Sequence, residues 1–192
     1  MKESNVFTIP FRRKREGRTY YRQRIKILLS DMARFVIRGS SKNFQASIVQ
    51  YDQKGDKILF TIDAKALSKM GWKGGTGNIP SAYLIGALAG KKALESGIKD
   101  AVLDIGFKNS TKGSRLYAAL AGAIDSGLEI PFNKEVLPST ERISGKHIAD
   151  YANMLKSDKT KYERQFSGYL KNGFIPEDLA KHFKEIKVRI HG

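Results

Sequence analysis

The most constraining feature of the sequence is an apolar stretch over residues 78–107, which predicts a helix followed by a buried strand. Asn78 is a favourable N-cap, and Pro80 suits the first helical turn, because the N–H group that proline lacks would have no helical partner there. Apolar residues then recur at helical spacing, and Gly97 suits the left-handed position at which many helices end. Ala101–Ile105 is a short apolar run, typical of a buried strand. The stretch predicts a helix packed on a sheet and a return strand within that sheet.

A membrane-spanning interpretation of this stretch fails. Lys91 and Lys92 interrupt the apolar run well short of the roughly 20 residues that a crossing needs. The start, MKESNVFTIP, has no apolar signal-peptide region, and no membrane partner is expected. The chain has 192 residues and no cysteine, so we expect one domain with tails, no disulfide and no thiolate metal site, which fits a reducing cytoplasm.

Positive charge is concentrated at the N-terminus. The net charge is +16, and residues 1–30 hold 9 Lys or Arg against 2 Asp or Glu. The segment FRRKREGRTYYRQR predicts an extended basic arm leading into a short helix over Tyr20–Leu29, in which Ile25, Leu28 and Leu29 would touch the core. This composition favours a polyanionic partner, nucleic acid first and an anionic membrane second. The alternative is a solvated charge run with two structural tyrosines.

Three strands are predicted next, in ARFVIRGS, FQASIVQYD and KILFTIDA. Two short polar turns join them, which indicates an antiparallel meander. In the first strand Phe35 and Ile37 point one way, and Arg34, Val36 and Arg38 point the other. The first turn, residues 39–43, is either a phosphate contact or an ordinary polar hairpin tip, and the sequence favours neither.

The second half of the chain alternates loops with helices. A short helix over Ala64–Met70 leads to a glycine-rich loop, residues 71–78, whose free N–H groups at the start of the central helix predict an anion site. Neither a P-loop nor a GxGxxG motif is present there. Trp72 in this loop is either a core residue or a platform for an RNA base or sugar.

A second polar loop, residues 107–115, follows the buried strand and is another possible phosphate site. A helix over Leu116–Ser126 and a short strand in LEIPF would complete a β-helix-β crossover with parallel pairing. Residues 133–192 predict a helical tail, including a helix over Ser144–Leu155, that lies on the domain or on a partner.

The evidence for a catalytic site in the sequence is weak. Asp63, Asp104 and Asp125 lie around the predicted sheet and suggest a two-metal nuclease as an alternative function, although each ends an element or lies inside an apolar strand. The three histidines, His147, His182 and His191, have no metal-ligand spacing, and GxSxG, HExxH and CxxC are absent. We therefore expect no enzyme activity, metal or cofactor.

Four segments together carry a close resemblance to a known family. They are PFRRKREGRTYYRQR, the turn GSSKN, the run GWKGGTGNIPSAYLIGALAGKKA, and AVLDIGFKNSTKGSRLYAALAGAIDSGLEIP. The chain resembles the archaeal branch of the large-subunit ribosomal protein family that binds 5S ribosomal RNA, number eighteen of that subunit. Halophilic members of this branch are acid-rich, so the charge of +16 indicates a non-halophilic source.

The resemblance implies an α/β fold with a mixed sheet, in which the antiparallel meander precedes the helix-strand-helix-strand crossover. It implies a basic RNA-binding arm at 1–24, a core domain at 25–132 and a helical C-terminal extension at 133–192. The implied function is structural. The protein would bind 5S rRNA and help attach it to the large-subunit rRNA at the central protuberance of the cytoplasmic ribosome, beside neighbouring large-subunit proteins. The alternatives are the nuclease on a similar sheet and a basic peripheral membrane or chaperone-like binding protein.

The resemblance also implies four groups of RNA contacts. The arm would contribute Arg12, Arg13, Lys14, Arg15, Arg18, Tyr20, Tyr21, Arg22 and Arg24. The hairpin tip would contribute Ser40, Ser41, Lys42 and Asn43. The glycine loop would contribute Trp72, Lys73, Thr76 and Asn78. The crossover loop would contribute Ser110, Thr111, Lys112 and Arg115.

Overall fold

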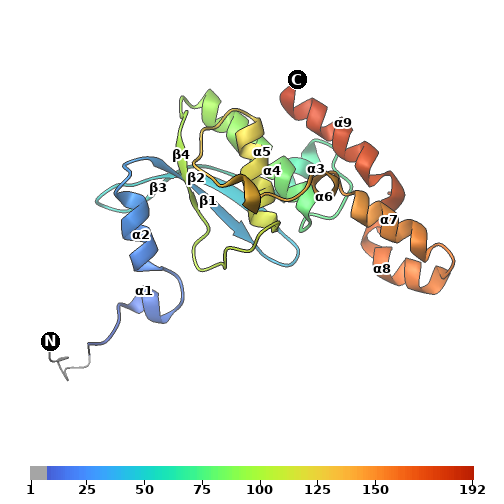
Figure 1. Ribbon diagram of the computed structural model, residues 1–192, viewed down its shortest axis with the longest axis horizontal. Coiled ribbons are helices and arrows are strands. Elements are labelled where there is room, and N and C mark those ends of the chain that lie inside the picture. The colour runs from blue at the N-terminus through green and yellow to red at the C-terminus, as the bar shows by residue number, and fades with distance from the viewer. Residues whose placement is uncertain (1–7) are drawn as a thin grey trace.

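A four-stranded mixed sheet forms the centre of the computed structural model, which describes residues 8–192 (Figure 1). Its strands are β1 (Ala33–Gly39), β2 (Phe44–Gln50), β3 (Lys57–Asp63) and β4 (Ala101–Asp104). The first three form an antiparallel meander, and β4 pairs parallel to β1, which gives the order β3-β2-β1-β4. The predicted fold class and meander are confirmed.

The two faces of the sheet differ in the residues they carry. Phe35 and Ile37 of β1 are fully buried and face the helix layer. Arg34 and Arg38 alternate with them, so they lie on the opposite face. This second face is where the N-terminal segment packs, and its arginines matter for the site described below.

The helix layer consists of α3 (Ala64–Lys69), α4 (Ile79–Glu95) and α5 (Arg115–Asp125). Asn78 caps α4 as predicted, since its side chain accepts a hydrogen bond from the Ser81 N–H at 2.9 Å. Gly97 follows the helix with a φ of +78°, a value that favours glycine. The predicted boundaries of the central helix are therefore confirmed.

Two glycines allow α4 and α5 to touch backbone to backbone. A Cβ atom added at Gly86 would overlap the carbonyl oxygen of Ala119, and one added at Gly122 would overlap that of Tyr83. The small side chains on both helices make this approach possible and bury the interface completely.

The strand predicted in LEIPF is absent from the described part of the chain. Only an isolated parallel bridge, Asp100 with Glu129, forms there. The Ala101 N–H donates to the Glu129 carbonyl at 3.0 Å, and the Glu129 N–H donates to the Lys99 carbonyl at 2.9 Å. Pro131 has no N–H group, so the ladder cannot continue two residues later. Leu128 and Ile130 nevertheless bury their side chains, which explains the apolar pattern.

The N-terminal segment is less extended than predicted. Residues 1–7 of the predicted arm lie outside the described residues, and the remainder contains a helical turn, α1 (Arg12–Arg15), before α2 (Tyr21–Leu28). The prediction that Ile25 and Leu29 touch the core is wrong, because their side chains are 59% and 81% exposed. Ile27 is the buried residue of α2, and Leu28 is half-buried.

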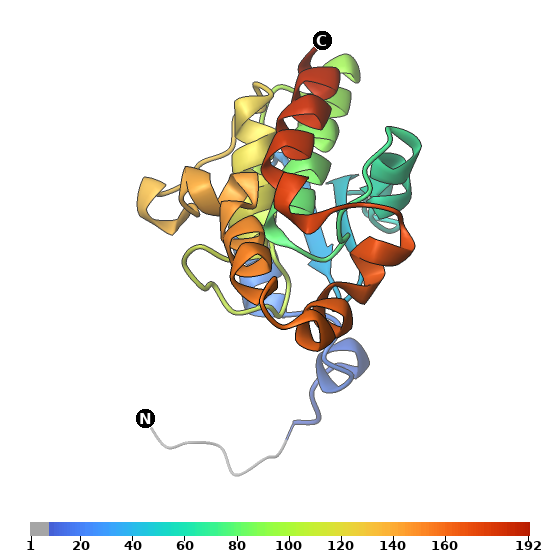
Figure 2. The same ribbon diagram turned by 90° about the vertical axis from the view of Figure 1, so that its right-hand side faces the viewer.

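The C-terminal segment contributes to the same core as the sheet and α4. It comprises η1 (Lys134–Val136), α6 (Thr140–Ser144), α7 (Lys146–Leu155), α8 (Lys159–Lys171), η2 (Pro176–Asp178) and α9 (Leu179–His191). The helix predicted over 144–155 is present as α7, and Gly145, at a φ of +82°, separates it from α6 before it. Figure 2 shows α9 lying along α4. The ring centroids of Phe183 in α9 and Tyr83 in α4 are 5.4 Å apart. Within residues 8–192, every helix is too short or too polar to cross a bilayer.

Gly86→Ala should destabilise the protein by about 2–3 kcal/mol, because the new methyl group forces α4 and α5 apart. Urea unfolding followed by circular dichroism would measure this change. Gly168→Ala in α8 is the matched control, since open space surrounds that position. It should leave stability unchanged or raise it by up to about 1 kcal/mol through helix propensity. Equal effects of the two substitutions would contradict the packing argument.

Candidate nucleic-acid interface

Three predicted contact loops converge at the hairpin tip between β1 and β2. Arg115, at the start of α5, donates from Nη1 to the carbonyl oxygens of Ser40 at 3.0 Å and Gly77 at 2.6 Å. The Thr76 hydroxyl donates to the Lys42 carbonyl at 2.6 Å. Gly77 must be small, because a Cβ atom there would overlap the Ser41 carbonyl oxygen. The hairpin tip, the glycine loop and the crossover loop therefore form one connected surface.

Arg115 and Thr76 were predicted as RNA contacts, but in the structure they make hydrogen bonds within the protein. Their polar atoms are directed at backbone carbonyls, and both side chains are only half-exposed. In this arrangement they hold the loops together. The side chains of Ser40, Ser41, Lys42 and Asn43 remain on the exposed tip.

Trp72 lies in the core, which is the alternative that its residue type favoured. Its side chain is 4% exposed, and its ring stacks on His182 with centroids 5.1 Å apart. Its Nε1–H donates to the Gly75 carbonyl at 3.3 Å. The ring is therefore not available as a platform for an RNA base in this conformation.

The start of α4, where the sequence predicts an anion site, makes contacts within the protein. Asn78 uses its Oδ1 to cap the Ser81 N–H and donates from Nδ2 to the Tyr169 hydroxyl at 3.1 Å. Ile79, Pro80 and Ser81 are buried beneath the C-terminal segment. Lys73 is the predicted loop residue that stays exposed, and its backbone N–H donates to His182 Nε2 at 3.2 Å.

The crossover loop keeps part of its predicted surface. Thr111 and Lys112 are exposed, although Lys112 pairs with Glu135 at 3.3 Å and Ser110 bonds to the Tyr117 hydroxyl. Lys108 was not among the predicted RNA contacts. It lines a cavity of about 260 Å³ together with residues of the hairpin tip.

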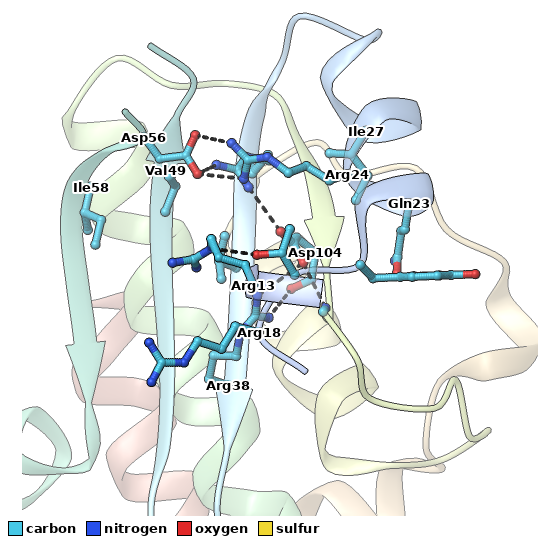
Figure 3. Close-up of a pocket in the computed structure, with 15 residues that line it drawn as sticks. Arg13, Arg18, Gln23, Arg24, Ile27, Arg38, Val49, Asp56, Ile58 and Asp104 are labelled. Carbon is cyan, nitrogen blue, oxygen red and sulfur yellow. Dashed lines mark hydrogen bonds and ion pairs between the residues drawn. The ribbon is translucent and has the colours of Figure 1, made fainter. Parts of the chain in front are cut away.

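A second cavity, of about 220 Å³, lies between the N-terminal segment and the face of the sheet opposite α4 and α5 (Figure 3). The arm supplies Arg13, Arg18, Thr19, Tyr20, Gln23, Arg24 and Ile27 to it. The sheet side supplies Arg34, Val36, Arg38, Val49, Asp56, Ile58, Asp104 and Gly106. Arg38 lines both cavities, so the arm surface and the hairpin-tip surface adjoin. Arg38 was not among the predicted RNA contacts. Its alternation with Phe35 and Ile37 along β1 is the feature of the sequence that could have placed it on this face.

Ion pairs connect the arm to the sheet across this cavity. Arg24 contacts both carboxylate oxygens of Asp56 at 2.7 Å, and Arg34 Nη2 lies 2.6 Å from the same carboxylate. Arg34 and Arg38 also contact Asp104, at 3.2 and 3.4 Å. The hydrogen bond from Arg24 is the main cause that lowers the pKa of Asp56 below its ordinary value of 3.8. The pairing therefore persists at neutral pH and weakens only as the pH falls below that value.

The other predicted arm residues face solvent to different degrees. Arg12 and Arg18 contact Glu16 at 3.6 and 3.1 Å, and Arg13 donates to the Thr19 hydroxyl. The exposed cations with no side-chain contact described are Lys14, Arg15 and Arg22. Tyr20 packs against Phe107 of the crossover loop at 5.8 Å, and Tyr21 packs against Phe11 at 5.3 Å. Tyr20 and Phe107 are both exposed and so form an accessible aromatic pair.

The aspartates considered for a nuclease make unrelated contacts. Asp63 caps α3, Asp104 pairs with the two arginines of β1, and Asp125 accepts from the Tyr83 hydroxyl and lies 3.4 Å from Lys187 Nζ. Among residues 8–192, no three His, Cys, Asp or Glu side chains gather closely enough to hold a metal ion.

Comparison with protein families identifies a matching family. The sequence matches the family described as ribosomal large subunit proteins 60S L5 and 50S L18, over residues 5–100 and 95–133. These ranges contain the basic arm, the whole sheet, α4 and α5. The match covers more than half of the 192 residues.

Arg115→Gln should loosen the hairpin tip, because the two carbonyls it joins would lose a charged donor. We expect a loss of about 1–2 kcal/mol in unfolding free energy and faster amide exchange in residues 40–43. Hydrogen exchange with mass spectrometry and urea unfolding would measure the two effects. Arg164→Gln, on the exposed surface of α8, removes the same charge and should change neither quantity. Unchanged exchange at the hairpin tip would contradict the bridging role.

Proposed function

We propose, from the premise that this chain belongs to the large-subunit ribosomal protein family of 60S L5 and 50S L18, that it binds 5S rRNA and helps attach it to the large-subunit rRNA. Membership itself makes the chain an rRNA-binding protein of the large ribosomal subunit, with a role in translation in the cytoplasm. The choice of 5S rRNA and the place at the central protuberance are our proposal, supported by the resemblance of the sequence motifs.

The observation that carries the proposal is the connected basic surface. The arm, the hairpin tip and the crossover loop adjoin through Arg38, Arg115 and the two cavities. Lys14, Arg15 and Arg22 are exposed at one end, and Lys42 and Lys108 at the other. Such a surface suits a folded RNA that presents phosphates along more than one helix, since each neutralised phosphate releases counterions.

The binding mechanism contains no chemical step. Lysine and arginine side chains neutralise phosphates, while the shape of the surface selects a folded RNA over an extended one. Tyr20 and Phe107 together offer an exposed aromatic surface on which an unpaired base can stack. The functional division is an arm at 1–24, an RNA-binding core at 25–132 and an extension at 133–192. The extension contacts neighbouring large-subunit proteins through its exposed helices.

Exposed arm cations should account for much of the affinity and its salt dependence. The triple substitution Lys14→Gln, Arg15→Gln and Arg22→Gln should reduce the slope of log K against log salt by about 3. It should weaken binding of 5S rRNA by roughly thirtyfold or more at low salt. Filter binding across salt concentrations would measure both quantities, and deletion of residues 1–24 should abolish tight binding.

The matched control removes three exposed cations from the C-terminal helices, in Arg164→Gln, Lys171→Gln and Lys181→Gln. This variant should bind 5S rRNA nearly as tightly as the wild type. An equal loss from both triple variants would indicate non-specific charge attraction, and salt-independent or absent wild-type binding would overturn the proposed function. Cleavage of the RNA that requires magnesium and Asp104 would instead support the nuclease.

A further inference from the structure

We infer that Asp56 is a positioning residue that holds the basic arm on the sheet in the arrangement that binds RNA. The inference rests on the proposed function, because it assigns a role to an acidic residue within that RNA-binding surface. A carboxylate on a surface for a polyanion is expected to oppose binding. The contacts of Asp56 indicate that its net effect is the reverse.

The first observation is the geometry of the arm contact. Arg24 Nη1 donates to Asp56 Oδ2 and Arg24 Nη2 donates to Asp56 Oδ1, both at 2.7 Å. This two-pronged arrangement is the most specific contact that arginine makes with a carboxylate. The side chains are 28% and 26% exposed, so water screens the pair only in part. The contact spans 32 positions in sequence and joins α2 to the turn that precedes β3.

The second observation is that the same carboxylate is fixed from the sheet side. Arg34 Nη2 lies 2.6 Å from Asp56, and the Arg34 side chain is 5% exposed. Arg34 also reaches Asp104, which accepts a hydrogen bond from the Gly106 N–H at 2.8 Å. Asp56 is therefore contacted from the sheet as well as from the arm, and Figure 3 shows Arg24 directed at it.

Charge explains why the arm needs this carboxylate. The face of the sheet on which the arm lies carries Arg34 and Arg38, which would repel an arm rich in cations. Asp56 and Asp104 pair with these arginines and neutralise their charge, and Asp56 in addition binds Arg24 of the arm. The helix α2 has eight residues and buries only Ile27 among them, so it depends on such contacts to stay in place.

An arm that is already docked on the sheet loses less conformational entropy when RNA binds. An arm that is free in solution loses conformational entropy on binding, and this loss subtracts from affinity. Docking through Asp56 fixes Arg13, Arg18 and Tyr20 along the cavity beforehand. Removing the negative charge of Asp56 should therefore weaken RNA binding, although simple charge attraction predicts a tighter complex.

The test is the affinity of Asp56→Asn for 5S rRNA, measured by filter binding at fixed salt. We expect binding roughly fivefold weaker than wild type. Asp52→Asn is the matched control, since Asp52 is an exposed acid nearby whose Oδ1 accepts from the Lys54 N–H, a contact that asparagine retains. It removes the same charge and should bind as tightly as wild type or slightly more tightly. Asp56→Asn binding equal to or tighter than Asp52→Asn would overturn the inference.

A double-mutant cycle separates positioning from general stability. Arg24→Gln alone should weaken binding, and adding Asp56→Asn to it should produce little further loss, because the two residues act through one contact. Additive losses would contradict the inference. Amide exchange in residues 21–28 of the free protein should rise in Asp56→Asn and Arg24→Gln. It should not rise in Arg22→Gln, which removes an exposed neighbouring cation.

These measurements also separate the proposed binding of 5S rRNA from the positioning role of Asp56. Wild-type protein that fails to bind 5S rRNA overturns the proposed function and, with it, the role of Asp56 in RNA binding. Wild-type protein that binds, with unchanged affinity and exchange in Asp56→Asn, overturns the positioning role alone. If Asp56→Asn unfolds, amide exchange over residues 21–28 in Arg24→Gln compared with Arg22→Gln decides the question, since both residues lie on the short helix α2 outside the core. Equal exchange in the two variants would overturn the positioning role.

Discussion

The arrangement of the whole domain depends on the backbone contact between α4 and α5. Because Gly86 and Gly122 have no Cβ atom, the backbone carbonyl groups of Ala119 and Tyr83 can occupy the space that a side chain at these positions would fill. This contact fixes both helices as one layer over Phe35 and Ile37 of the sheet. The loops that enter α4 and α5 then begin at the same end of the layer, next to the β1–β2 hairpin. Arg115 and Thr76 can reach the hairpin carbonyls only because the helix layer brings them there.

Positive charge in this protein has two separate uses. Arg24, Arg34 and Arg115 are directed inward, at carboxylates or carbonyls, where they connect segments that are distant in sequence. Lys14 and Arg15 are exposed and available for phosphates. A net charge of +16 indicates a polyanionic partner but cannot separate these two uses. The separation depends on where the few acids lie, because each buried arginine requires a carboxylate or carbonyl near it.

Local signals in the sequence were sufficient for most of the fold. The cap at Asn78, the meander of three strands and the buried strand that begins at Ala101 follow from nearby residues and periodicity, and the structure has them. The parallel pairing of β4 with β1 was not predicted, because this strand was expected to pair with LEIPF instead. The differences from the sequence-based predictions have two main physical causes: partners that are distant in sequence, and the missing backbone donor of Pro131. Tyr169 and His182 lie about a hundred positions beyond the glycine loop, so no residue near the loop indicates that they contact it. Ile27 rather than Ile25 turns inward because tertiary packing, not helical periodicity, sets the rotation of a helix of eight residues.

The C-terminal segment covers the start of α4. Trp72 and Asn78 belong to a loop that resembles an anion site in sequence, yet the Trp72 ring stacks on His182 and Asn78 donates to the Tyr169 hydroxyl. Leu179 and Ile186 anchor α9 in the core, so this cover is part of the folded domain. The start of α4 is therefore covered by other parts of the chain. The arm, the hairpin tip and the crossover loop keep exposed cations, and we propose this surface for RNA because the position of the arm on the opposite face of the sheet sets its shape.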